Sequence, residues 1–171
     1  GDTQKHRVTV QSFLRALGPV TDWVSDLYCS LFPTMRLPLE TLASASRKWC
    51  VTSPCPFTTV TVNRGRASGG EPHAHGNNAR GYLQLLLCAG CWSGGELRLP
   101  LLFSGKGVPL QPGDVVAFDG STLLHGVEEF SGTRVSLVYF IDRGAELVLR
   151  GVVPPTTGHL ESAPYPEPTV G

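Results

Sequence analysis

Apolar residues in the first third of the chain recur at steps of three and four positions, which places them on one face of an α-helix. The Gly18-Pro19 pair interrupts this pattern, so it predicts either one helix or two helices that are broken there. Phe32-Pro33 ends the segment, and a second, shorter helix is predicted over residues 39–47. The apolar face consists of Phe13, Leu14, Leu17, Val20, Trp23, Val24, Leu27 and Leu31.

From residue 57 onward, short apolar segments alternate with glycine and proline, a pattern typical of strands joined by tight turns. Residues 57–63 are rich in β-branched side chains, and residues 81–87 are nearly all apolar, as in a strand that is covered on both faces. These segments predict a mainly β fold behind an N-terminal helical layer, for which an antiparallel sandwich or a jelly-roll barrel is the economical arrangement. Further strands are predicted at residues 96–100, 108–110, 115–118, 123–127 and 134–141.

The 171 residues suffice for one domain with its own hydrophobic core. Within it we expect a helical support segment at residues 1–53, a β core at residues 54–150 and a proline-rich strap or tail at residues 151–171. No apolar run approaches the roughly 20 residues that a membrane span requires. Residues 1–6 lack the apolar stretch of a signal peptide. We therefore expect an intracellular protein without membrane contact, and a monomer.

Basic and acidic residues balance, with fourteen of each. Domains that hold nucleic acid through its phosphates are normally basic, so contact with DNA would need a local patch. Arg64, Arg66 and Arg80 flank the segment around His73 and offer such a patch, although a solvated loop is the more ordinary interpretation.

The five cysteines are an odd number, and without an export signal this favours free thiols in a reducing compartment. Cys88 and Cys91 have CxxC spacing, and Cys50 and Cys55 could add two further zinc ligands. Structural zinc sites usually combine two tighter pairs of Cys or His. Buried or strand-end thiols are therefore favoured over a metal or redox site.

Three of the five histidines form the strongest candidate site. His73 and His75 are two positions apart, and in an extended segment such residues point to the same face. His125 lies fifty residues beyond His75, in a predicted strand that a jelly roll can bring alongside. Two close ligands and one remote ligand make a facial triad, which leaves three positions of an octahedral iron open. His6 and His159, near the ends of the chain, are interpreted as surface residues.

Arg134 and Ser136 predict a carboxylate clamp, because alternate residues of a strand place a guanidinium and a hydroxyl on one face. The segment that follows Arg134 is almost wholly apolar and therefore central. A charge at the start of a central strand needs a partner, and a bound dicarboxylate would supply it.

Taken together, residues 57–141 resemble the core of the iron(II)- and 2-oxoglutarate-dependent dioxygenases. They are most similar to the TET/JBP branch, whose members oxidise the methyl group of modified pyrimidines in DNA. The resemblance implies a double-stranded β-helix (jelly-roll) core that uses Fe(II) and 2-oxoglutarate, although the arginine clamp would also suit another acid such as ascorbate. The matching segments occur in family order and are FTTVTVN (57–63), HAHGNN (73–78), GGELRLP (94–100), QPGDVVAFDGSTLLHGV (111–127) and GTRVSLVYF (132–140).

The resemblance also assigns roles to individual residues. It makes His73 and His125 iron ligands and Arg134 the partner of the far carboxylate of 2-oxoglutarate, assisted by Ser136. Asn78 falls where the branch has a polar residue in the substrate pocket.

Two further residues, Asn63 and Tyr82, are weaker candidates for the substrate pocket. For Asn63 the ordinary alternative is capping at the end of a strand. For Tyr82 it is packing in the hydrophobic core.

The sequence departs from the family at one position, because the family motif is His-x-Asp and His75 stands in the place of the aspartate. A carboxylate neutralises one charge of Fe(II), whereas an imidazole does not. Three alternatives stay open: His75 ligates the iron, it turns away and leaves a weaker two-histidine site, or the change silences the enzyme.

The resemblance implies an oxygenase that hydroxylates the methyl group of 5-methylcytosine or thymine in DNA, in the nucleus, on a base that is flipped out of the duplex. One alternative is a silenced dioxygenase-fold module that binds without oxidising. The other is a cupin-type enzyme with three histidines and no 2-oxoglutarate. The cupin fits less well, because residues 76–81 contain no glutamate and His125 follows Gly113 by twelve residues.

Overall fold

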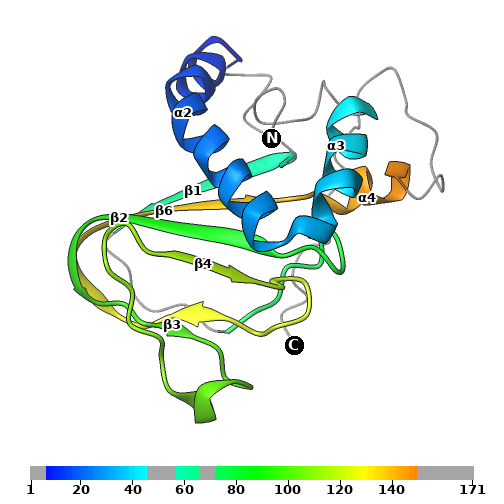
Figure 1. Cartoon of the computed structure of the whole chain (residues 1–171). Helices are drawn as coiled ribbons and strands as arrows, with labels where there is room; N and C mark the ends of the chain where they lie inside the picture. Colours follow the sequence, from blue (N-terminus) through cyan, green and yellow to red (C-terminus); the bar gives the residue numbers. More distant parts are fainter. Residues whose placement is uncertain (1–6, 46–56, 66–71, 150–171) are drawn as a thin grey trace, which may run out of the picture.

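A four-stranded antiparallel sheet lies at the centre of the molecule, with helices over one face and a smaller two-stranded sheet facing the other (Figure 1). This computed structural model describes residues 7–45, 57–65 and 72–149. The predicted boundaries at residues 53 and 150 and the predicted tail lie outside these ranges. The larger sheet has the order β1 (Thr59–Gly65), β6 (Phe130–Phe140), β2 (Gln84–Gly94), β4 (Val115–Phe118), and the smaller pairs β3 (Leu97–Arg98) with β5 (Gly126–Val127).

The N-terminal segment forms one continuous helix, α2 (Arg7–Leu31), so the one-helix alternative is correct. Pro19 lies inside it on an exposed position, where the lost backbone hydrogen bond does not leave a group buried without a partner. A short 3-10 turn, η1 (Pro33–Met35), leads into α3 (Arg36–Ala45), which begins three residues earlier than predicted. None of the described helices is long and apolar enough to cross a membrane.

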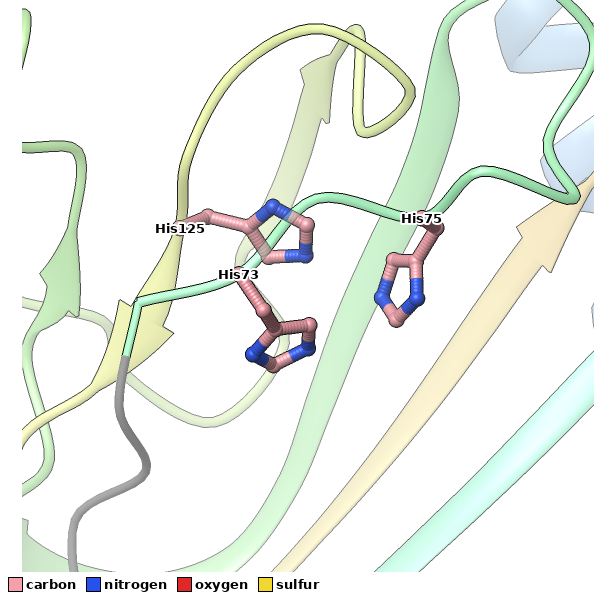
Figure 2. Close-up of side chains that lie close together, drawn as sticks. All are labelled: His73, His75 and His125. Atoms are coloured by element: carbon pink, nitrogen blue, oxygen red, sulfur yellow. The ribbon is translucent and has the colours of Figure 1, made fainter. Parts of the chain in front are cut away.

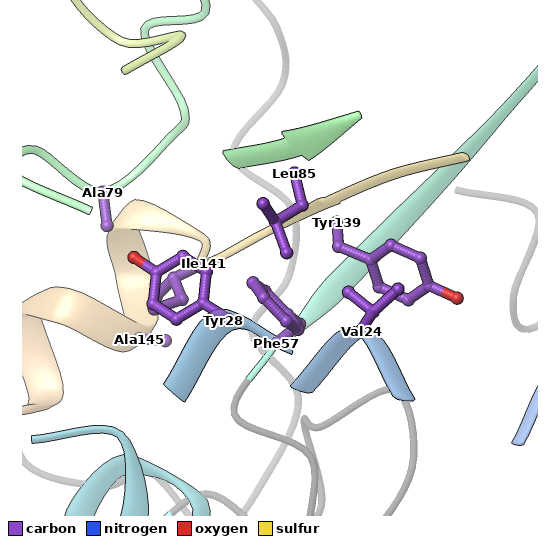
Figure 3. Packing of buried hydrophobic residues seen from close by; sticks show 8 residues of the cluster. All are labelled: Val24, Tyr28, Phe57, Ala79, Leu85, Tyr139, Ile141 and Ala145. Carbon is purple, nitrogen blue, oxygen red and sulfur yellow. The ribbon is translucent and has the colours of Figure 1, made fainter. Parts of the chain in front are cut away.

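A hydrophobic cluster joins α2 to the central sheet (Figure 3). Val24 and Tyr28 of α2 are 0% and 1% exposed, and they meet Leu85 of β2 and Tyr139 of β6. The ring of Phe57 lies between them, with its centroid 5.4 Å from that of Tyr28 in an edge-on contact. The predicted apolar face covers the sheet only in part: Leu17, Val20 and Val24 pack there. Phe13, Trp23 and Leu31 are 41%, 49% and 55% exposed, and the buried Tyr28 was not predicted as part of this face.

Two hydrogen bonds, one buried and one partly buried, hold the helix against the sheet and the residue before β2. The hydroxyl groups of Thr21 and Tyr139 lie 3.1 Å apart, and the backbone N–H of Leu83 donates to the hydroxyl of Tyr28 at 3.2 Å. Both tyrosines thus bury their rings in the cluster and still satisfy their polar ends, as buried tyrosines generally do. Burial raises the pKa of Tyr28, and the hydrogen bond from Leu83 opposes that rise.

The side chains of β6 alternate between two environments. Leu137 and Tyr139 pack on the helical side, whereas Arg134 and Ser136 face the smaller sheet. β2 follows the same rule, because Leu85 belongs to the helical cluster whereas Leu86 and Cys88 belong to a second cluster between the sheets. The second cluster consists of Leu86, Cys88, Leu97, Leu99, Leu110 and Phe118.

The predicted strands agree with the structure to within a few residues, with two exceptions. β2 begins at Gln84 rather than at residue 81, and it continues through the CxxC segment to Gly94. Residues 108–110 form no strand, and Val108 makes only an isolated bridge to Leu97. The two longest strands approach closely at Gly90, where a side chain would collide with the carbonyl of Thr133 and where φ is +120°.

A helix after β6, α4 (Arg143–Leu149), was not predicted. Asp142 caps its first turn, because its carboxylate accepts a hydrogen bond of 2.7 Å from the backbone N–H of Gly144. Glu146 in the first turn is buried and accepts the backbone N–H of Arg80 at 3.0 Å. An aspartate followed by a glutamate within one turn was the pattern that could have predicted this helix start.

Replacing Leu85 by alanine tests the contact between α2 and the sheet. We expect Leu85→Ala to lower the free energy of unfolding by about 2–5 kcal/mol, because it removes buried methyl groups and leaves a cavity. Leu101→Ala is the matched control at a leucine that is 73% exposed, and should change that free energy by less than about 0.5 kcal/mol. Urea unfolding followed by circular dichroism measures both, and equal effects would contradict the assigned core.

Candidate metal centre and anion site

Three histidines from two distant segments converge on one point (Figure 2). One ring nitrogen from each histidine lies within 4.8 Å of those of the other two, a spacing at which one cation can be reached from all three. His73 and His125 form an isolated antiparallel bridge, in which each backbone N–H donates to the carbonyl of the other at 2.9 Å. His75 joins them because its backbone N–H donates to the carbonyl of Gly120 at 2.8 Å.

His125 is the most firmly held of the three. It is 7% exposed, its ring lies against Phe118 with centroids 4.9 Å apart, and its Nδ1 lies 2.9 Å from the carbonyl oxygen of Leu123. Because a carbonyl can only accept, that contact places the ring proton on Nδ1 and leaves the lone pair on Nε2. His125 is thereby prepared to bind a metal through Nε2.

Burial and the neighbouring imidazoles affect the protonation of His75 and of His125. Burial lowers the pKa of His75, and the neighbouring charges of His125 and then His73 lower it further. Burial likewise lowers the pKa of His125, against the hydrogen bond to Leu123 and with a small additional effect of His73. Both shifts favour the neutral ring, which is the form that ligates metals. No Asp, Glu or Cys within the described ranges belongs to this group.

A tight turn carries the chain into His125. The carboxylate of Asp119 accepts the backbone N–H of Ser121 at 2.9 Å and its hydroxyl at 2.6 Å. Burial raises the pKa of Asp119, but hydrogen bonds from Ser121 and Thr122 outweigh it, so the pKa is lowered overall. The turn is therefore held by a charged acceptor, and it positions both Gly120 and His125.

Arg134 is buried without a counter-charge. It is 3% exposed, and no carboxylate in the described part of the chain forms an ion pair with it. Its Nη1 donates to the carbonyl of Gly95 at 2.9 Å and its Nη2 to the sulfur of Cys88 at 3.2 Å. Among the solvent-inaccessible side-chain nitrogen and oxygen atoms of the described residues, only its Nε has no hydrogen-bond partner. A buried cation in this condition calls for an anionic ligand.

Aromatic rings and a thiol hold the guanidinium in place. The Arg134 Cζ lies 5.5 Å from the ring centre of Trp92 and 5.8 Å from that of Phe130. Cys88 is fully buried and Cys91 is exposed, so the two cysteines of the CxxC segment do not share a site. Cys50 and Cys55 lie outside the described residues.

One cavity of about 810 Å³ connects the histidines with Arg134. Ser136 lines it, and its hydroxyl lies 3.9 Å from the sulfur of Cys88. Asn78 lines it as well and is 5% exposed. Asn63 is exposed at its edge, opposite Ser136 in the register of β1 and β6.

The structure does not bring every candidate to this cavity. Tyr82 is not among its lining residues and packs against the helical cluster, the alternative that the sequence left open for it. Arg64 lines the cavity, Arg80 does not, and Arg66 lies outside the described residues. His6 and His159 also lie outside the described residues.

Sequence reasoning missed Gln84. It is 2% exposed, lines the cavity and accepts a hydrogen bond of 2.7 Å from the amide of Asn78. The available clue was a single amide within the otherwise apolar run of residues 81–87.

Comparisons with known proteins agree with this geometry. The Tet_JBP family model, which describes the oxygenase domain of the 2OGFeDO superfamily, matches residues 3–143. Among solved structures, the chain is similar to "NgTET1 in complex with 5mC DNA", with a TM-score of 0.60 and 25% sequence identity. That similarity covers 74% of this chain and 48% of the other, so this chain spans about half the length of that protein. A search of curated proteins gave no match.

The structural similarity confirms the predicted fold class. The protein is mainly β with an N-terminal helix, and it shares the double-stranded β-helix core of TET oxygenases. The two facing sheets described above form that core, and the metal and anion sites lie between them.

Gly120 offers a test of how the metal centre is positioned. A Cβ at this position would collide with the buried amide of Gln84 and push away the carbonyl that holds His75. We expect Gly120→Ala to weaken Fe(II) binding about tenfold, the usual cost of disturbing a group that supports a ligand. Gly76→Ala is the control, because no atom lies within 4 Å of a Cβ there. Anaerobic titration with Fe(II) measures both, and equal affinities would contradict the assigned support.

Proposed function

Because the chain belongs to the TET/JBP family of oxygenase domains in the iron- and 2-oxoglutarate-dependent superfamily, we propose that it hydroxylates the methyl group of a modified pyrimidine in DNA, 5-methylcytosine or thymine. Membership of this superfamily implies Fe(II) and 2-oxoglutarate. The observation that carries the proposal is the buried Arg134 without a counter-charge, in the same cavity as three convergent histidines.

The donor atoms present fit a divalent transition metal. Imidazole nitrogen is a ligand that iron, zinc and copper all accept, and three such nitrogens leave open positions on an octahedral ion. His125 has its proton fixed on the nitrogen that faces Leu123, and the pKa values of His75 and His125 are lowered toward the neutral form. His75 and His125 would therefore hold the metal as neutral ligands, with His73 as the third donor.

The residues around Arg134 fit a dicarboxylate. Its planar guanidinium is kept in one orientation by Gly95, Cys88 and two aromatic rings, which reduces the entropy lost when a carboxylate binds. Ser136 lies two residues along β6 on the same side, and its hydroxyl can add a hydrogen bond. In this family the iron with 2-oxoglutarate supplies the oxidising chemistry. The protein's share is to hold both ligands and to orient the substrate.

Support for a DNA substrate comes from the family and from the NgTET1 structure, which contains 5mC DNA. A base must leave the duplex to enter a cavity, and the cavity of about 810 Å³ here has room for a group of that size. Arg64 at its edge is a cation available for a phosphate. A DNA substrate would place the protein in the nucleus.

His75 favours a second candidate function, a binding module that retains the pocket but does not oxidise. With three neutral ligands the bound metal keeps its full charge, and this alters its redox balance relative to a centre with a carboxylate. A cupin-type enzyme without 2-oxoglutarate is disfavoured, because it would leave the buried Arg134 unexplained.

Arg134 tests the cosubstrate site. We expect anaerobic Fe(II) with 2-oxoglutarate to give the weak visible charge-transfer band of this chelate. Arg134→Lys should raise the dissociation constant for 2-oxoglutarate at least about tenfold, because a point charge replaces a bidentate donor. Arg98→Lys is the control, at an exposed arginine paired with Glu128. Unchanged Fe(II) affinity shows that Arg134→Lys has folded, and unchanged 2-oxoglutarate affinity would refute the clamp.

Turnover by the wild-type protein and Fe(II) binding by a His75 variant test the proposed activity. We expect the wild-type protein to release succinate when supplied with Fe(II), 2-oxoglutarate and oligonucleotides containing 5-methylcytosine. His75→Ala should weaken Fe(II) binding about tenfold or more, because one of three ligands is lost. Mass spectrometry of succinate and of the modified base provides the measurement.

His75→Asp separates the two candidate functions. A wild-type protein that binds Fe(II) but releases no succinate would contradict the proposed oxygenase. Release restored by His75→Asp would then establish the silenced module. His6→Ala is a control at a histidine that is not assigned to the site.

A further inference from the structure

Two buried amide side chains lie together in the wall of the cavity. Asn78 and Gln84, here called the amide pair, are 5% and 2% exposed, and both line the cavity. The Nδ2 group of Asn78 donates to Oε1 of Gln84 at 2.7 Å. This bond couples the orientations of the two amides, because one of them donates and the other accepts.

The bond leaves two polar atoms of the pair unused. Within the described residues, Oδ1 of Asn78 and Nε2 of Gln84 have no hydrogen-bond partner. Both atoms are accessible to solvent. Among the described residues, the only solvent-inaccessible side-chain nitrogen or oxygen without a hydrogen-bond partner is Nε of Arg134. The amide pair therefore presents one acceptor and one donor to the cavity.

The amide of Gln84 also lies next to the metal centre. It packs so closely on Gly120 that a Cβ there would collide with it. The carbonyl of the same glycine accepts the backbone N–H of His75 at 2.8 Å. One backbone segment thus connects the amide pair with a metal ligand, and both line the same cavity.

The position of Gln84 in β2 does not require a polar residue. Its neighbours on this strand are apolar, and a buried amide costs free energy unless its hydrogen bonds are made. Only one of the bonds available to Gln84 is made within the described residues. The unused N–H is explained if a ligand accepts it.

We infer that Gln84 is a further specificity-determining residue, which together with Asn78 binds the Watson–Crick edge of a pyrimidine base. That edge carries a donor next to an acceptor, N4–H and N3 in cytosine, or N3–H and O4 in thymine. Oδ1 of Asn78 accepts from the donor, and Nε2 of Gln84 donates to the acceptor. The inference rests on the proposed function for its choice of a base as ligand.

The test measures binding of single-stranded oligonucleotides that carry either 5-methylcytosine or an abasic site at one central position. Single strands avoid the cost of opening a duplex. We expect the full chain to bind the 5-methylcytosine strand at least about tenfold more tightly than the abasic strand. Gln84→Met, which keeps the volume but removes the amide, should lower that ratio about tenfold. Gln111→Met makes the same substitution at an exposed glutamine and should leave the ratio unchanged.

Two results would overturn the inference: a wild-type protein that does not distinguish the two strands, or a Gln84→Met variant that distinguishes them as well as wild type. If Gln84→Met does not fold, Gln84→Glu retains the acceptor for Asn78 and removes the amide donor. The charge-transfer band of Fe(II) with 2-oxoglutarate, recorded on the same preparations, separates the two proposals. If the wild-type protein prefers the base, Gln84→Met loses that preference and neither shows the band, the role of Gln84 is supported and the oxygenase is refuted. If the wild-type protein shows the band but no base preference, the oxygenase is supported and the role of Gln84 is refuted.

Discussion

The antiparallel pairing of β2 with β6 is the constraint on which the rest of the structure depends. These two strands are the longest, and residues 84–88 of β2 and 134–140 of β6 are buried or half-buried on both faces. Because side chains alternate along a strand, one register decides at once what packs under α2 and what faces the cavity. Tyr139 and Leu85 go to the helical side, while Arg134 and Gln84 go to the other. A slip by one residue would exchange core and site.

Electrostatics explain why the cavity needs a ligand. Arg134 has lost its water and has gained a carbonyl, a thiol and two rings, none of which carries a full negative charge. The free-energy cost of burying this charge is offset by the apolar clusters that pack on the two faces of the larger sheet. A site that is unfavourable when empty binds a complementary anion strongly, since the ligand supplies the missing charge.

The metal centre follows a different rule, because it is assembled from neutral groups. His75 and His125 have lowered pKa values and lie beside one another without a carboxylate in the described ranges. Burial, together with the neighbouring imidazoles, favours for these two rings the neutral form that a metal requires. Cation binding here brings in positive charge that no side chain offsets, so an anionic cosubstrate held by Arg134 would complete the balance.

Local periodicity allowed the sequence alone to predict much of this protein. Part of the apolar face of α2, the strand at residues 115–118 and the pairs His73 with His75 and Arg134 with Ser136 follow from spacings of two to four residues. Only the tertiary structure decided that His125 pairs with His73, that Gln84 meets Asn78, and that Tyr82 lies on the helical side. Those contacts join residues whose faces depend on strand register and turn geometry, which the interactions of the whole fold determine.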